Sequence, residues 1–85
     1  MRFFVESSLK QAPTPEILAL IPAESARGKE LDAQGLREKL YVAADMSRAW
    51  QVYVCDTEEE VLAALESFPL HQYSNSVITP LAEDM

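Results

Sequence analysis

Few of the residue types that build common functional sites are present in this sequence. Its 85 residues include one cysteine, one histidine and two glycines. The lone Cys55 excludes an internal disulfide and fits a reducing compartment. Two glycines are too few for a glycine-rich phosphate loop, and no spacing of His, Cys, Asp and Glu resembles a metal site. We therefore expect neither a metal nor a cofactor.

Basic residues and long apolar runs are also scarce. Seven Lys and Arg stand against 14 Asp and Glu, which gives a formal net charge of −7. Nucleic acids and anionic membrane surfaces are bound by clustered basic residues, so we expect neither as a partner. No apolar run reaches the roughly 18 residues of a membrane span, and no signal-peptide pattern follows Met1. These absences favour a soluble, cytoplasmic protein.

What remains is the composition of one small globular domain over residues 1–85. Hydrophobic residues make up 48% of the chain, too many for a disordered segment. We expect Thr14 and Thr57 to be N-caps, Pro22 to bend the first helix and Gly35 to end it. The hydrophobic pattern predicts strands at 1–8, 38–45, 49–56 and 74–81, a hairpin turn at 46–48, and helices at 15–34 and 58–67.

The order β-α-β-β-α-β is the split pattern of ferredoxin-like α+β folds, an antiparallel four-stranded sheet with two helices on one face. Trp50 and Val52 alternate with Gln51 and Tyr53, so both faces of the predicted hairpin carry large side chains. The helices cover only one face. We expect the other face to pair with the sheet of a second copy, which gives a homodimer or a higher homo-oligomer.

The first predicted helix carries a carboxylate on its apolar stripe. Helical spacing from Ile17 reaches positions 20, 21, 24, 28 and 31, so Glu24 should point toward the sheet. An ionised carboxylate buried alone costs several kcal/mol, so Glu24 must be paired, hydrogen-bonded, protonated or beside a wet cleft. The last two states suit a general acid or base with a raised pKa. Alternatively, the bend at Pro22 brings Glu24 to the edge of the stripe, in a structural role.

The other candidate site residues each have an ordinary structural explanation beside the functional one. Gly28, on the same stripe, leaves a space that either a close helix–sheet approach or a small-molecule pocket would explain. Tyr41 and Trp50 are typical core aromatics that can also line a pocket. His71 lies in the predicted turn 68–73, either as an exposed polar residue or as a proton shuttle at a pocket mouth.

Taken in order, these segments resemble the muconolactone isomerase family of dimeric α+β barrels. The resemblance rests on the inward Glu24, a helix that ends at Gly35, the strands "LYVAAD" and "WQVYVCD", the turn "ESFPLHQY" with its Pro-Leu and Tyr73, and the closing "VITPL". It implies a ferredoxin-like fold whose dimers pair through their sheets. It also implies cofactor-free movement of a double bond in a small unsaturated lactone, as in aromatic catabolism. Glu24 would then be the acid or base in a cleft that Tyr41 lines.

Several positions depart from the pattern of that family. Ser25, Val42 and Met46 stand where the family has a lysine, an arginine and a histidine, and His71 and Gln72 alter the turn. The lost basic groups are the expected partners of the lactone's carboxylate. The resemblance therefore implies the fold but not the same substrate.

Two functions of different class fit these observations. The leading hypothesis is a cofactor-free isomerase that acts by proton transfer on a small unsaturated metabolite. Its expected catalytic residues are Glu24, Tyr41 and His71, and its expected substrate contacts are Gly28, Trp50 and Tyr73. The alternative is a non-catalytic small-molecule-binding or oligomerisation module of the same architecture, in which Glu24 only costs stability.

Overall fold

The computed structural model describes residues 1–82 and has the predicted order of elements. A short 3-10 helix, η1, precedes the last strand. The order confirms the ferredoxin-like prediction. The elements are β1 (Arg2–Leu9), α1 (Pro15–Ala33), β2 (Arg37–Val42), β3 (Arg48–Val54), α2 (Glu58–Glu66), η1 (His71–Tyr73) and β4 (Ser74–Leu81).

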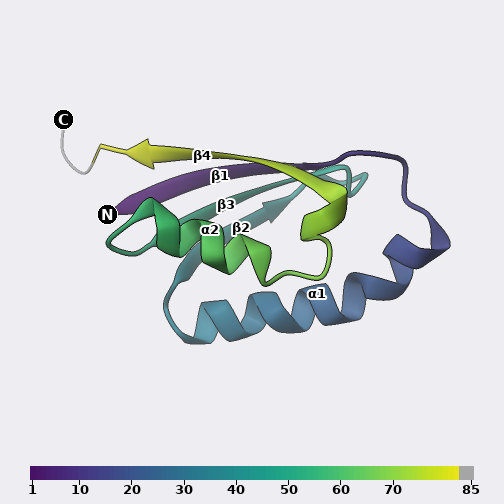
Figure 1. Cartoon of the computed structure of the whole chain (residues 1–85), viewed down its shortest axis with the longest axis horizontal. Coiled ribbons are helices and arrows are strands. Elements are labelled where there is room, and N and C mark those ends of the chain that lie inside the picture. Colours follow the sequence, from purple (N-terminus) through teal and green to yellow (C-terminus); the bar gives the residue numbers. More distant parts are fainter. Residues whose placement is uncertain (83–85) are drawn as a thin grey trace.

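The four strands form one antiparallel sheet in the order β2-β3-β1-β4. Both helices lie on the same side of this sheet (Figure 1), which confirms the predicted two-layer arrangement. Because each strand alternates its side chains between two faces, one set of residues faces the helices and the other set faces away from them.

The first helix begins and ends where its capping residues predict. The Thr14 hydroxyl accepts the backbone N–H of Ile17 at 3.3 Å, and Pro15 occupies the first helical position. Gly35 has a φ of +75°, the left-handed conformation that follows many helix ends. Pro22 lies inside α1, and the ribbon continues through it as one helix (Figure 1).

The second helix begins at the predicted N-cap, Thr57, with the side-chain half of the predicted capping box. The Thr57 hydroxyl accepts the N–H of Glu60 at 3.3 Å, and the Glu60 carboxylate lies 3.5 Å from that hydroxyl. The first turn holds three acidic residues, Glu58, Glu59 and Glu60. Their negative charges stabilise the helix because they lie at the positive end of its dipole.

The core lies between the sheet and the two helices. Phe3 and Val5 of β1 and Tyr53 of β3 face the helices and are almost completely buried. They pack in one cluster with the buried residues of the helices and of the turn that follows α2, namely Leu31, Val61, Ala64, Leu65 and Phe68. Residues 17 and 31 at the two ends of the predicted stripe of α1 are both buried, which confirms its direction.

No element of residues 1–82 covers the other face of the sheet, which we call the open face. Its pairs include Phe4 with Val52 and Tyr41 with Trp50 across neighbouring strands. Tyr41 is 59% exposed and Val77 is 62% exposed. The open face comprises Phe4, Tyr41, Trp50, Val52, Val54, Val77 and Thr79, together with the charged residues Arg2, Glu6, Lys39 and Arg48.

The turn between β2 and β3 is longer than predicted. The strands end at Val42 and restart at Arg48, so the turn runs over 43–47 rather than 46–48. Ala43 and Met46 close this turn through a backbone hydrogen bond of 2.8 Å, and Met46 adopts a φ of +65°. An irregular step in β2 between Arg37 and Lys39 shifts the pairing register, so that Arg37 faces the helices opposite Tyr53.

Candidate functional site

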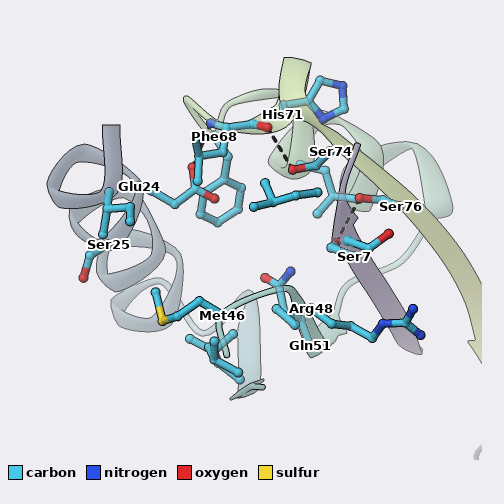
Figure 2. A pocket seen from close by; sticks show the side chains of 18 of the residues that line it. Ser7, Glu24, Ser25, Met46, Arg48, Gln51, Phe68, His71, Ser74 and Ser76 are labelled. Carbon is cyan, nitrogen blue, oxygen red and sulfur yellow. Dashed lines mark hydrogen bonds between the residues drawn. The ribbon is translucent and has the colours of Figure 1, made fainter. Parts of the chain in front are cut away.

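A cavity of about 540 Å³ lies between α1 and the helix-facing side of the sheet. Its walls come from α1, from the β2–β3 hairpin, from β1 and β4, and from the turn before η1. Figure 2 shows the side chains around this space. Most of the wall is apolar, and a few polar groups converge on it, which is typical of a small-molecule site.

Glu24 projects from α1 into this cavity and lies beside the ring of Phe68 (Figure 2). Its Oε1 accepts the backbone N–H of Leu70 at 2.9 Å. Within residues 1–82, no hydrogen bond or ion pair engages Oε2. The predicted inward carboxylate is therefore present, with one oxygen held by the turn and the other available to a ligand.

The surroundings of Glu24 raise its pKa above the usual range of a glutamate. Burial has the largest effect, because it disfavours the charged form. The N–H of Leu70 and the positive charges of Arg37 and His71 oppose this effect without cancelling it. Glu24 thus keeps its proton to a higher pH than an exposed carboxyl group, which suits a group that both takes and returns a proton.

A buried guanidinium group, that of Arg37, forms part of the same cavity wall. The Arg37 side chain is 7% exposed. Its Nε and Nη2 donate to the two carboxylate oxygens of Asp32 at 2.7 and 3.2 Å. Its Nη1 donates to Oε1 of Gln51 at 3.3 Å, and that oxygen also accepts the Tyr53 hydroxyl at 2.6 Å. Three of the five N–H groups of Arg37 are used in this way, so one on each Nη has no acceptor in the described part of the chain.

Gly28 makes room for this guanidinium group. A Cβ built at position 28 would lie 2.5 Å from Nη2 of Arg37, which is too close for any side chain without movement of the arginine. Of the two explanations for this glycine, the close approach is the one observed. Gly28 itself does not line the cavity, so its predicted contact with the substrate is not found.

His71 shares the cavity with Glu24, as the sequence led us to expect. It is half-buried, lines the cavity from the start of η1, and lies at the rim with its ring turned away from Glu24 (Figure 2). The backbone nearby is fixed, because the Ser74 hydroxyl donates to the carbonyl of Leu70 at 2.9 Å.

Besides Gly28, three predicted site residues do not line this cavity. Tyr41 and Trp50 pair across β2 and β3 on the open face, so the structure does not bring them together with Glu24 in this cavity, and their site roles stay predictions. Strand alternation is the physical reason. Leu40 and Gln51 point into the cavity, so Tyr41 and Trp50, which are next to them in the chain, point to the open face. Tyr73 is half-buried at the end of η1 and lies outside the cavity wall.

Arg37 and Gln51 are two buried polar wall residues that sequence reasoning missed. Both are buried beneath α1, at 8% and 7% exposure. The one sequence signal for them was Gly28 in the middle of the first helix. A glycine there lowers helix stability by about 1 kcal/mol relative to alanine, so its presence indicates a close contact. Nothing in the sequence identified Arg37 as the partner in that contact, because the register shift in β2 decides which way it points.

A carboxylate held between a helix and an antiparallel sheet can be compared with known proteins. The sequence matches the family model described as Muconolactone delta-isomerase over residues 1–84. The chain belongs to the muconolactone delta-isomerase family. No curated protein matches the sequence.

Two solved structures have the same fold as this member of the family. One is a crystal structure of muconolactone isomerase, with a TM-score of 0.84 and 20% identity over 99% of this chain and 91% of that one. The other is the 5-chloro-2-hydroxyhydroquinone dehydrochlorinase of Burkholderia phenoliruptrix, in complex with 2,5-dihydroxybenzoquinone. That match has a TM-score of 0.80 and 14% identity over 99% of this chain and 96% of that one. These matches confirm the predicted dimeric α+β barrel fold.

Two other structural features, a metal site and a membrane-spanning helix, are absent from the described residues. Within residues 1–82, no group of three or more His, Cys, Asp or Glu side chains is placed to hold a metal ion. Neither α1 nor α2 has the length and apolar character needed to cross a membrane.

Proposed function

We propose that this protein is a cofactor-free isomerase that moves a double bond in a small unsaturated lactone or a related carbonyl compound. The observation that carries the proposal is Glu24, a half-buried carboxyl group with a raised pKa and one free oxygen in an apolar cavity. Membership of the muconolactone delta-isomerase family supports this class of reaction.

The reaction needs a single group that takes a proton and gives it back. The Glu24 carboxylate removes a proton from the carbon next to the conjugated system, and the C–H electron pair becomes a new double bond. The carbonyl oxygen carries the negative charge of the resulting dienolate. Glu24 then returns the proton to the carbon beside the carbonyl group, which restores the carbonyl and regenerates the carboxylate. The double bond has moved by one position, with atoms and charge balanced.

The charge that develops on the carbonyl oxygen calls for a positive group in the same water-poor space. Arg37 supports this role, because it is buried, lines the cavity and keeps an unused N–H on each Nη. A preorganised donor of this kind is worth roughly 10²–10³-fold in rate in other enzymes. We assign to His71, at the rim, the exchange of protons between the cavity and solvent.

One observation favours a second candidate function. The hydrogen bond from the Leu70 N–H to Glu24 gives the carboxylate a structural task, since it ties the turn after α2 to α1. A glutamate kept for that task would suit a binding module of the same architecture without catalysis. The two functions differ in whether the negative charge of Glu24 is needed.

Glu24→Gln separates the two, because the amide oxygen can still accept from Leu70 while the side chain no longer takes a proton. Muconolactone in D₂O is the test compound, followed by NMR for both double-bond position and deuterium uptake. We expect Glu24→Gln to lose about 10²–10⁴-fold in rate. Glu30→Gln, an exposed position further along α1, should retain the wild-type rate. Deuterium uptake by Glu24→Gln at the wild-type rate would reject Glu24 as the acid–base group, and a wild type that takes up no deuterium would favour the binding module.

We also propose that two copies pair through their open faces. Large apolar side chains gather there, and none of the described elements covers them. The dimeric α+β barrel fold of the chain supports this mode of pairing. The cavity lies on the other side of the sheet, so pairing leaves it accessible.

A further inference from the structure

Met46, in the β2–β3 turn, adopts a backbone conformation that L-residues other than glycine and asparagine rarely take. Its φ is +65°. The turn imposes this conformation, because the Met46 N–H donates to Ala43 and the Asp45 carboxylate accepts both the N–H and the hydroxyl of Ser47. A left-handed conformation is unfavourable for an L-residue, and the methionine side chain makes no local hydrogen bond to offset this.

Packing in the core does not explain why a methionine stands there. Its side chain is 55% exposed, so it contributes little buried area to the fold. Backbone strain of this kind concentrates at ligand sites, where the side chain is kept for what it contacts. Met46 lines the Glu24 cavity and lies across it from His71 (Figure 2).

Other exposed apolar side chains gather at the same place. Eight large hydrophobic residues are exposed within residues 1–82, and four of them line this one cavity. These four are Leu18 of α1, Leu40 and Val42 of β2, and Met46. Since they are both exposed and part of the wall, they mark the mouth of the cavity, which we call the apolar mouth. Glu24 and Arg37, by contrast, belong to its buried part.

We propose that Met46 determines specificity by holding an apolar substituent of the ligand at the apolar mouth, while the polar end of the ligand reaches Glu24 and Arg37. The proposal rests on the isomerase site described above and names its substrate class, an unsaturated carbonyl compound with an alkyl or similar apolar arm. Methionine suits this task because its unbranched, polarizable side chain adapts to the shape of what it contacts.

Binding at equilibrium tests this without any need for turnover. The probes are 2-butenolides with a methyl, propyl or pentyl arm on the saturated ring carbon, titrated by calorimetry. For the wild type, affinity should rise about fourfold with each methylene that reaches the mouth. Met46→Leu keeps an apolar side chain and should keep this rise. Met46→Asn tolerates the left-handed conformation but is polar, so the rise in affinity with each methylene should drop to about twofold, supported only by Leu18, Leu40 and Val42.

The thermal unfolding midpoint shows that lost binding is not lost folding. Met46→Asn should unfold at the same temperature as the wild type or a few degrees higher, because the strain at position 46 is relieved. Leu62→Gln, a change of similar exposure on α2 outside the cavity, should leave both binding and its dependence on arm length unchanged. A wild-type dependence on arm length in Met46→Asn would overturn the proposal.

A second probe separates failure of this proposal from failure of the isomerase function. If none of the butenolides binds the wild type, the lactone class of the proposed function is rejected. The dye 1-anilinonaphthalene-8-sulfonate, an anion with a large aromatic part that fluoresces in apolar surroundings, then reports on the mouth. A signal that falls several-fold in Met46→Asn and persists in Met46→Leu supports the role of Met46. An equal signal in all three proteins overturns it.

Discussion

Gly28 lies directly against the guanidinium group of Arg37, since a Cβ at position 28 would come within 2.5 Å of Nη2. This contact joins a residue in the middle of α1 to a buried cation at the start of β2. A glycine in a helix interior is less favourable than alanine by about 1 kcal/mol. The chain accepts this cost where the helix passes over Arg37, and the result is a positive charge in the wall of the Glu24 cavity.

The first prediction is that the effect of Gly28→Ala on the free energy of unfolding depends on whether Arg37 or a methionine stands at position 37. In the wild type the new methyl group must displace Arg37, so unfolding free energy should stay level or fall by up to about 1 kcal/mol. In an Arg37→Met background the methyl group meets only a flexible side chain, and the helix should gain about 1 kcal/mol. Chemical denaturation of the four proteins of this double-mutant cycle measures the coupling.

Glu30→Ala, on the exposed side of α1, is the control for helix propensity in this cycle and should give no coupling with Arg37→Met. Additive effects of Gly28→Ala and Arg37→Met would contradict the view that the glycine exists to accommodate the arginine.

The position of Glu24 could be predicted from helical spacing alone. Residues 17, 24 and 31 are seven apart, so once Ile17 and Leu31 are buried, Glu24 must share their face. The helix caps and the order of the elements followed equally from local chemistry at Thr14, Gly35 and Thr57. These features depend on residues close together in the sequence.

The rest of the site depends on register, which the sequence pattern did not determine. One irregular step between Arg37 and Lys39 turns Arg37 toward the helices. The strand beyond it places Leu40 in the cavity and Tyr41 on the open face, the reverse of what was expected for Tyr41. A shift of one residue in a strand exchanges its two faces, so an error in the hairpin changes the list of site residues.

A second prediction concerns the pH dependence of stability and starts from the raised pKa of Glu24. Because its pKa in the folded protein lies above that of the unfolded chain, Glu24 favours folding when protonated, and that contribution is lost as pH rises through the folded pKa. Glu24→Gln resembles the protonated form. It should therefore match the wild type below about pH 4 and be the more stable protein at pH 7.

Denaturation curves at pH 4 and pH 7 provide the measurement. Glu30→Gln removes only an exposed ion pair with Arg27, worth less than about 1 kcal/mol, so it should stay close to the wild type at both pH values. If Glu24→Gln is less stable than the wild type at pH 7, the carboxylate is a net stabilising group and the desolvated site described here is wrong.

The third prediction has the opposite sign and concerns Asp32. Its hydrogen bonds with Arg37 lower the pKa of the Asp32 carboxyl group, so its contribution to stability is present above the unfolded pKa and lost as pH falls through the folded one. Asp32→Asn should cost about 1–3 kcal/mol at pH 7, because Arg37 stays buried without its partner charge. The difference from the wild type should shrink toward pH 2 in denaturation experiments. A difference that does not change with pH would assign the loss to packing rather than to charge.

The fourth prediction tests pairing through the open face with one exposed valine. Val77 is 62% exposed on β4, in a face that also presents Phe4, Trp50 and Val52. Val77 pairs across the sheet with Glu6, whose carboxylate is already bound to Arg48. If a second copy covers this face, Val77→Glu buries a second carboxylate beside Glu6, and light scattering should give the mass of one chain instead of two. Leu62→Glu adds the same charge on the far side of α2 and should leave the dimer intact. A wild-type protein with the mass of one chain at micromolar concentration would contradict the pairing itself. A Val77→Glu dimer would instead place the interface elsewhere, since two neighbouring carboxylates at positions 6 and 77 cannot both be buried without loss of affinity.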